Sequence, residues 1–184
     1  PPRSTLFPYT TLFRSPLIFM LIVNAVSGNI YENAELAKKF QEVKQHGTFR
    51  RLLLSRIEME KSRLRKKTED GFDIGLALEP GKRLQHGDII LESSETILIE
   101  QLPEKTLTVK FKDSDPELFL LVGHIIGNRH RPISINNETI SFPILDDSEM
   151  ELFQRLFHEV IDKIDLTVDE QRFIPHVSMD VHEH

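Results

Sequence analysis

The sequence contains no cysteine among its 184 residues. This absence excludes a disulfide framework, cysteine-ligated zinc, an iron–sulfur cluster and thiol catalysis. The P-loop, GxSxG and HExxH motifs are also absent, so the nucleotide-binding and hydrolytic sites that they mark are not predicted. The apolar run at residues 16–23 is far too short to span a bilayer, and no ordered signal peptide accompanies it. The sequence therefore predicts a cytoplasmic protein with no membrane partner and no catalytic residues.

Positive charge is also in short supply, since 23 Lys and Arg face 29 Asp and Glu for a net charge of −6. This acidic balance argues against binding to the nucleic-acid backbone. The basic run at residues 63–67 precedes Glu69 and Asp70 and contains no aromatic residue, which indicates a solvated face of a hairpin. A hydrophobic share of 39% is enough to bury a core. Eight histidines remain to be explained.

Residues 1–19 differ from the rest in having no acidic side chain. Within them, residues 5–15 read TLFPYTTLFRS, which resembles an in-frame translation of a DNA-sequencing adapter. We therefore expect residues 1–19 to be an artefactual extension and Met20 to be the natural start. Without Arg3 and Arg14, 21 basic residues would face 29 acidic ones, a net charge of −8.

Short apolar runs separated by turn signals dominate residues 20–102, which are predicted to form a small, mostly-β domain. One helix is predicted between Asn33, as its N-cap, and His46-Gly47, as its end. Asp70-Gly71 predicts a hairpin. The predicted strands of this domain lie at residues 21–26, 49–55, 63–68, 72–78, 89–91 and 97–100.

Residues 103–171 mix strands with two helices. One helix begins at Asp115-Pro116 and ends at a left-handed Gly127-Asn128, and the other begins at a capping box of Ser148 and Glu151. The predicted order, βαββαβ, is ferredoxin-like. The predicted fold class is therefore α+β, with the mostly-β domain at residues 20–102, the ferredoxin-like domain at 103–171 and a flexible, histidine-bearing tail at 172–184.

His124 and His130 lie in the segment GHIIGNRHRP, residues 123–132. Since the helix is expected to stop at Gly127-Asn128 and Pro132 excludes its continuation, His130 falls in a connection where its imidazole can point outward. An isolated pair at this spacing is more typical of a helix C-terminus, where a cationic residue meets the negative end of the dipole, than of a metal site. The spacing alone therefore leaves the role of both histidines open.

Three further histidines, His176, His182 and His184, lie within the last nine residues. A His-x-His pair in an extended segment can bring two imidazoles to one ion, and imidazole suits Ni, Cu and Zn. A solvated tail and the remnant of a purification tag are the alternatives, but Met, Asp and Glu interrupt the histidines in a way that no tag does. We predict that this tail binds a metal.

The other histidines, His46, His86 and His158, are predicted to be structural or exposed to solvent. The acidic residues between 146 and 151 are explained by the positive end of a helix dipole. No carboxylate–histidine set stands at catalytic spacing, which disfavours a hydrolytic metalloenzyme.

Several segments together resemble the family of the urease accessory protein UreE. The most specific is GHIIGNRHRP, which carries the motif GNRH after a helix. MLIVNAVSGNI resembles the start of the family's sequences, KSRLRKKTEDGFDIGLALEPGKRLQHGDII resembles their first domain, and LPEKTLTVKF resembles their domain junction. The resemblance covers most of residues 20–175.

The resemblance implies a cytoplasmic nickel metallochaperone for urease maturation, and not an enzyme. It implies a homodimer through the second domain, in which His130 of both chains binds one Ni(II) ion. His176, His182 and His184 are then candidates to complete the site, and His124 has a secondary part. Zn(II) and Cu(II) are the ions that could compete. The implied partners are the GTPase UreG and the apo-urease activation complex, and the first domain is implied to bind a peptide or partner.

The chain departs from the family pattern in the hairpin after the motif, SINNETISFPIL, which has no histidine, and in its short tail. We therefore expect one to a few ions per dimer. The alternative function is a peptide- or partner-binding scaffold module with incidental metal binding, which would bind nickel weakly and through the tail only.

Overall fold

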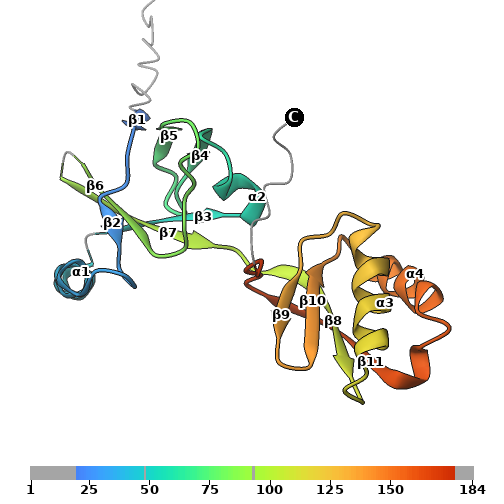
Figure 1. The fold of residues 1–184 in the computed structure, drawn as a ribbon. Helices are drawn as coiled ribbons and strands as arrows, with labels where there is room; N and C mark the ends of the chain where they lie inside the picture. The colour runs from blue at the N-terminus through green and yellow to red at the C-terminus, as the bar shows by residue number, and fades with distance from the viewer. Residues whose placement is uncertain (1–19, 48, 93, 177–184) are drawn as a thin grey trace, which may run out of the picture.

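The computed structural model describes residues 20–47, 49–92 and 94–176 (Figure 1). Their fold is α+β, as predicted. The predicted extension at residues 1–19, together with His182 and His184, lies outside the described residues. The helices are α1 (Ala34–His46), α2 (Arg56–Met59), α3 (Pro116–Gly127) and α4 (Asp147–Leu156), followed by a 3-10 turn, η1 (Ile161–Lys163). The strands are β1 (Met20–Val23), β2 (Gly28–Asn29), β3 (Arg50–Leu54), β4 (Arg63–Lys67), β5 (Asp73–Ala77), β6 (Asp88–Glu92), β7 (Glu95–Gln101), β8 (Glu104–Phe111), β9 (Ser134–Asn136), β10 (Thr139–Pro143) and β11 (Ile164–Gln171).

The elements from β1 to β7, called here the first unit, form two sheets with strand orders β1-β5-β4 and β2-β6-β7-β3. The pairs β1–β5 and β3–β7 are parallel, so each joins strands that are distant in sequence. Most of the buried apolar side chains of these strands form one cluster, which includes Val23, Leu52, Ile74 and Ile97, all fully buried. A smaller cluster packs α1 against β6 and β7. The first unit therefore has its own core.

The two ends of α1 are set by local capping residues that can be recognised in the sequence. The Asn33 side chain accepts a hydrogen bond of 3.0 Å from the backbone N–H of Leu36, which satisfies a donor in the first turn. At the other end Gly47 takes a φ of 68°, a left-handed conformation that favours glycine. The predicted cap and stop of this helix are both confirmed.

The basic run at residues 63–67 forms β4, which pairs with β5 in an antiparallel hairpin. Its exposed Arg65 side chain binds the carboxylate of Asp73 with two hydrogen bonds, of 3.1 and 2.7 Å. Lys66 is 2.6 Å from a carboxylate oxygen of Glu58. The predicted hairpin is confirmed, and two charges of the run are directed at carboxylates of the same unit.

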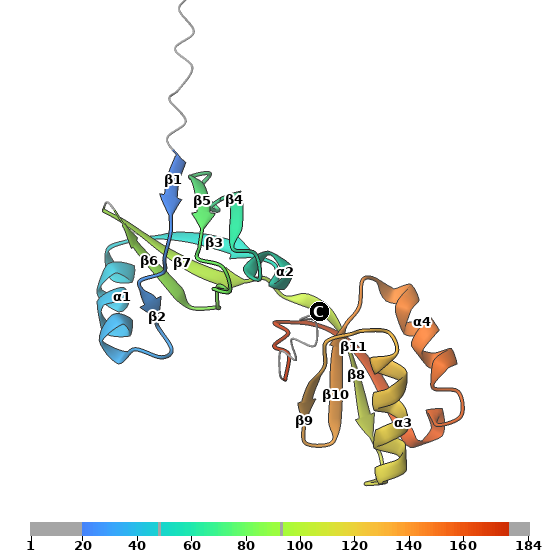
Figure 2. The same cartoon turned by 45° about the horizontal axis from the view of Figure 1, so that its top comes forward.

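The elements from β8 onward, called here the second unit, form one antiparallel sheet with strand order β11-β8-β10-β9. The chain runs strand, helix, strand, strand, helix, strand through it. Figure 2 shows α3 and α4 on the same side of the sheet. Their apolar side chains pack there against alternate residues of β8, namely Leu107, Val109 and Phe111. This core shares no residue with those of the first unit.

The start of α4 differs from the prediction. Its N-cap is Asp146, whose side chain accepts a 2.9 Å hydrogen bond from the backbone N–H of Ser148. Ser148 was expected to cap the helix but lies within its first turn. With Asp146 as the N-cap, Glu149 lies three residues later and accepts a 2.6 Å hydrogen bond from the backbone N–H of Leu145. This second side-chain bond favours Asp146 over Ser148 as the cap.

The chain stays ordered beyond the predicted end of the second domain. The Phe173 side chain, in the segment expected to be a flexible tail, is only 2% exposed. The carboxamide of Gln101 donates a 2.8 Å hydrogen bond to the carbonyl oxygen of Phe173. Residues 172–176 therefore belong to the packed structure, because an aromatic side chain in this segment buries itself against the junction of the two units. No helix among the described residues is long and apolar enough to cross a membrane.

Candidate metal site

The helix α3 presents one face to the core and the other to solvent. Asp115 caps its N-terminus, and Leu118, Val122 and Ile126 bury one stripe against the sheet. His124 lies on the outward side, and its Nε2 accepts a 3.0 Å hydrogen bond from the side-chain amide of Asn128. The imidazole of His124 is therefore exposed, but one of its two nitrogens already has a partner in the same helix turn.

His130, the residue that matches the family motif, has an unusual backbone. Its φ is 51°, the left-handed region that a residue with a side chain seldom adopts. The sequence predicted this conformation for Gly127-Asn128, but Asn128 is right-handed with a φ of −63°, so that prediction was wrong. The turn continues for three residues instead, closed by a 2.9 Å hydrogen bond from the N–H of His130 to the carbonyl of Gly127. His130 is exposed to solvent.

The residue after His130 anchors this connection to the second helix. The guanidinium of Arg131 forms an ion pair with the carboxylate of Glu149 in the first turn of α4. Both side chains are largely buried, with 25% and 16% of their surface exposed. Because Glu149 also accepts the N–H of Leu145, its carboxylate joins the connection to the start of α4. Sequence reasoning missed this pair, since no local pattern links residues 18 positions apart.

His176 is brought to the same connection by its backbone. Its N–H donates a 2.8 Å hydrogen bond to the carbonyl oxygen of Ile133, three residues beyond His130. His176 is exposed. The sequence offered no signal for this contact, which depends on where the segment after β11 crosses the second unit.

The described residues do not assemble a complete metal site within one chain. No group of three or more His, Asp or Glu side chains that could hold an ion is found in this part of the chain. The structure thus places His124, His130 and His176 on and around one connection, all three exposed, without closing a coordination shell around them. An ion bound there needs further ligands.

The remaining histidines have other surroundings. His158 is exposed at the end of α4, where its Nδ1 lies 3.0 Å from the carbonyl oxygen of Arg155. His86 is half-buried in the first unit and stacks on Tyr31, with ring centroids 5.5 Å apart. Burial and, secondarily, the positive charge of Arg172 lower the pKa of His86. His46 ends α1. His46 and His86 therefore belong to the first unit, and His158 follows α4.

Comparisons with known proteins extend this picture. Residues 30–100 match the N-terminal domain of the UreE urease accessory protein family. The chain is 26% identical to the urease accessory protein UreE of Streptococcus vestibularis over 133 residues, which cover 72% of this chain and 85% of that protein. It is 38% identical to the UreE of Pseudomonas putida strain GB-1 over 92 residues, 47% of this chain and 54% of that protein.

A third relative, the UreE of Natronomonas pharaonis, is 26% identical over 129 residues, and the match spans 60% of its length. The proteins that this chain resembles are thus accessory proteins by name, not enzymes. The chain is thus similar to the UreE family of urease accessory proteins, both in the match of its residues 30–100 to the family's N-terminal domain and in these relatives.

Proposed function

We propose that this chain is a cytoplasmic metallochaperone that binds Ni(II) and delivers it for assembly of the urease metallocentre. Similarity to the UreE family supports the link to urease. The observation that carries the proposal is the hydrogen bond from His176 to Ile133, because it ties the start of the histidine-bearing tail to the connection that contains His130. Imidazole is the ligand left to a chain without cysteine, and it suits Ni(II), with Zn(II) and Cu(II) as competitors.

The outward face of α3 supports a homodimer. Leu120 is 75% exposed and Leu121 is 37% exposed, and His124 follows one turn after Leu120 on the same side. Large apolar side chains at this exposure on a helix favour burial against a partner. If a two-fold axis lies beside this face, the His130 residues of both chains approach one ion. A dimer would thereby supply ligands that the single chain lacks.

Such a site fits the work of a carrier. Two His130 imidazoles from a dimer would hold the ion at the surface, and His176, His182 and His184 would add ligands that detach one at a time, with His124 secondary. Each detachment opens a coordination position for a recipient. We propose UreG and the apo-urease activation complex as the recipients. Because only neutral imidazole binds a metal, nickel affinity is expected to fall as the pH drops below neutrality.

Calorimetric titration of Ni(II) into the full chain and into His130→Asn tests the proposal. Asparagine tolerates the left-handed backbone of this position but is a poor nickel ligand. We expect the wild type to show a tight site with one ion per dimer, and the variant to lose it. His158→Asn, which removes an exposed imidazole at the end of α4, serves as the matched control and should bind as the wild type does.

An unchanged tight site in His130→Asn would refute the role of His130. Weak binding that depends on the tail alone, in wild type and variant alike, would favour the scaffold function instead. Replacing His182 and His184 together with Asn in the full chain separates these outcomes, because it removes tail ligands and leaves His130 in place.

A further inference from the structure

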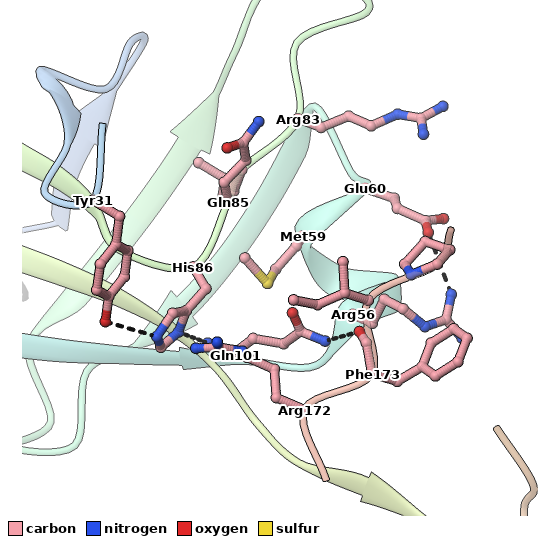
Figure 3. Close-up of a pocket in the computed structure, with 13 residues that line it drawn as sticks. Tyr31, Arg56, Met59, Glu60, Arg83, Gln85, His86, Gln101, Arg172 and Phe173 are labelled. Carbon is pink, nitrogen blue, oxygen red and sulfur yellow. Dashed lines mark hydrogen bonds and ion pairs between the residues drawn. The ribbon is translucent and has the colours of Figure 1, made fainter. Parts of the chain in front are cut away.

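A cavity of about 510 Å³ lies where the segment after β11 packs on the first unit (Figure 3). Its walls come from α2, from the turn before β6, from the end of β7 and from residues 172–175. Neither unit forms it alone. This volume lies within the range of pockets that bind a ligand. His124, His130 and His176, the predicted metal ligands among the described residues, do not line it.

The wall made by the second unit is held in place by two contacts of Phe173, and a third contact fixes one of its partners. The Gln101 carboxamide donates to the Phe173 carbonyl at 2.8 Å. The guanidinium of Arg56 lies 5.7 Å from the centroid of the Phe173 ring, within cation–π range. Arg56 is itself fixed, since its Nε donates a 2.8 Å hydrogen bond to Glu104. The cavity is therefore a built feature rather than a gap between loosely placed segments.

Apolar surface makes up the inner part of the cavity. Met59, Leu84 and Phe173 are all at most 5% exposed and line it. At the rim, by contrast, Tyr31 is 69% exposed and Ile174 is 59% exposed. Exposed tyrosine and isoleucine beside an apolar pocket are features of a protein-binding surface, where they become buried on association. A small inorganic anion would not bury these two side chains.

Positive charge gathers at this place in an otherwise acidic chain. Three arginines line the cavity, Arg56, Arg83 and Arg172, and the one lining carboxylate is that of Glu60. Arg56 is also paired with Glu104, which does not line the cavity. Glu60 is 3.4 Å from Arg56 and so is already engaged. Arg172 has no carboxylate partner among the described residues, and in Figure 3 it extends from the end of β11 toward the His86 ring. This guanidinium can therefore pair with an anionic group that enters the cavity.

We propose that this cavity docks an acidic segment of a partner protein, with a carboxylate bound by Arg172 and a neighbouring apolar side chain inserted against Met59, Leu84 and Phe173. Arg172 and Tyr31 then act as the anchors, which are residue types that dominate binding energy at interfaces. The acidic character of the ligand follows from the charge of Arg172, and its apolar side chain follows from the buried Met59, Leu84 and Phe173. This docking does not require nickel.

The probe is the peptide Ac-GLEFDG-amide, compared with its neutral counterpart Ac-GLQFNG-amide and with acetate. Each is titrated into the ¹⁵N-labelled full chain without nickel and followed by two-dimensional NMR. We expect the acidic peptide to bind at millimolar concentration or below and to shift the amides of residues 85, 86, 101 and 173. The neutral peptide and acetate should bind at least about tenfold more weakly, since each lacks one part of the recognition.

Substitutions then assign the contacts. Arg172→Gln should weaken the acidic peptide about tenfold, and Arg172→Lys should retain most of the affinity because it keeps the charge. Arg155→Gln, on the exposed side of α4, makes the same change of charge elsewhere and should have no effect. The melting temperature of each variant checks that it folds. Nickel titration of Arg172→Gln should match the wild type, so failure of this proposal and failure of the metal site are separate results.

Three outcomes would overturn the proposal. The first is no binding of the acidic peptide up to several millimolar. The second is equal affinity for the acidic and neutral peptides, or an unchanged affinity in Arg172→Gln. The third is a gain in peptide affinity when Asp180 and Glu183 are replaced by Asn and Gln in the full chain, since this would show that the chain's own acidic end, and not a partner, is the occupant.

Discussion

The backbone N–H of Gln101, at the end of β7, donates a hydrogen bond of 3.2 Å to Nδ1 of His86. The other ring nitrogen, Nε2, lies 3.2 Å from the hydroxyl of Tyr31. Nδ1 of His86 must therefore carry no proton if Gln101 is to keep this hydrogen bond. The same Gln101 holds Phe173 through its side chain, so one residue connects the His86 turn to the second unit.

This arrangement predicts a pH dependence of stability. The charged groups near His86 are Arg172, which lowers its pKa, and Glu100, which raises it less, while burial has the largest effect and lowers it. Because the folded pKa lies below the unfolded value of about 6.5, the unfolded chain takes up the proton first. The stabilising contribution of neutral His86 is therefore complete above pH 6.5 and decreases as the pH falls from there toward the folded pKa.

Urea unfolding of the wild type and of His86→Gln between pH 8 and pH 5 measures the effect. The wild type should lose more free energy of unfolding over this interval than the variant, since all other titrating groups are common to both. Equal slopes in the two proteins would show that His86 titrates alike in the folded and unfolded states.

A second prediction concerns the buried carboxylate that shapes the same turn. Asp88 is 4% exposed, and it accepts hydrogen bonds from the Gln85 N–H at 2.7 Å and from the Asn29 side chain at 2.9 Å. Burial raises the pKa of Asp88. Asp88→Ala leaves the Gln85 N–H without its acceptor, so the free energy of unfolding should fall by about 2 kcal/mol. Glu92→Ala, an exposed site on the same strand, should change it by less than about 0.5 kcal/mol, and similar losses at both sites would contradict the prediction.

The left-handed backbone of His130 predicts a gain in stability on substitution. An L-residue in this conformation costs about 1–2 kcal/mol, part of which glycine recovers. His130→Gly should therefore raise the free energy of unfolding of the metal-free chain by roughly 0.5–1 kcal/mol, and His130→Ala should not. Thermal melts without metal measure this. A destabilised His130→Gly would mean that the imidazole makes stabilising contacts in the metal-free chain.

The exposed face of α3 predicts the effect of a charge on self-association. Leu120→Asp should shift a dimer to monomer in sedimentation velocity, because an unpaired carboxylate would be buried in the interface. The change in the stability of the monomer itself should stay within about 0.5 kcal/mol, since Leu120 is 75% exposed. Leu91→Asp, on the first unit and 48% exposed, is the control. A dimer that survives Leu120→Asp would place the interface elsewhere.

Local chemistry made much of the fold predictable. Asn33 and Gly47 delimit α1, and Asp70-Gly71 joins β4 to β5, because caps and turns depend on neighbours in sequence. The same kind of signal was overlooked at Ser55, which forms a full capping box with Glu58 and starts the short helix α2. The start of α2 was therefore predictable, since the Ser-x-x-Glu pattern stands in the sequence.

The misses around the candidate site have a different cause. Helix α3 does end at Gly127-Asn128, as predicted, but the left-handed residue is His130. The chain continues after the helix into a turn, and the pair of Arg131 with Glu149 anchors this turn to another helix. The burial of Phe173 depends on Gln101 and Arg56 of the other unit. Both contacts join residues far apart in sequence. The sequence therefore singled out the histidines that are proposed as ligands, but it could not place the segments that carry them.

Residues 172–176 have a consequence for how the two sites relate. At one end of this five-residue stretch, Phe173 forms a wall of the cavity, and at the other, His176 is bonded to the connection that contains His130. A ligand that displaces Phe173 must also strain the hydrogen bond between His176 and Ile133. By thermodynamic reciprocity, if docking in the cavity weakens nickel binding by some factor, nickel weakens docking by that same factor. A recipient that enters the cavity would then loosen the ion, and the apo chain would bind that partner more tightly than the nickel-loaded chain does.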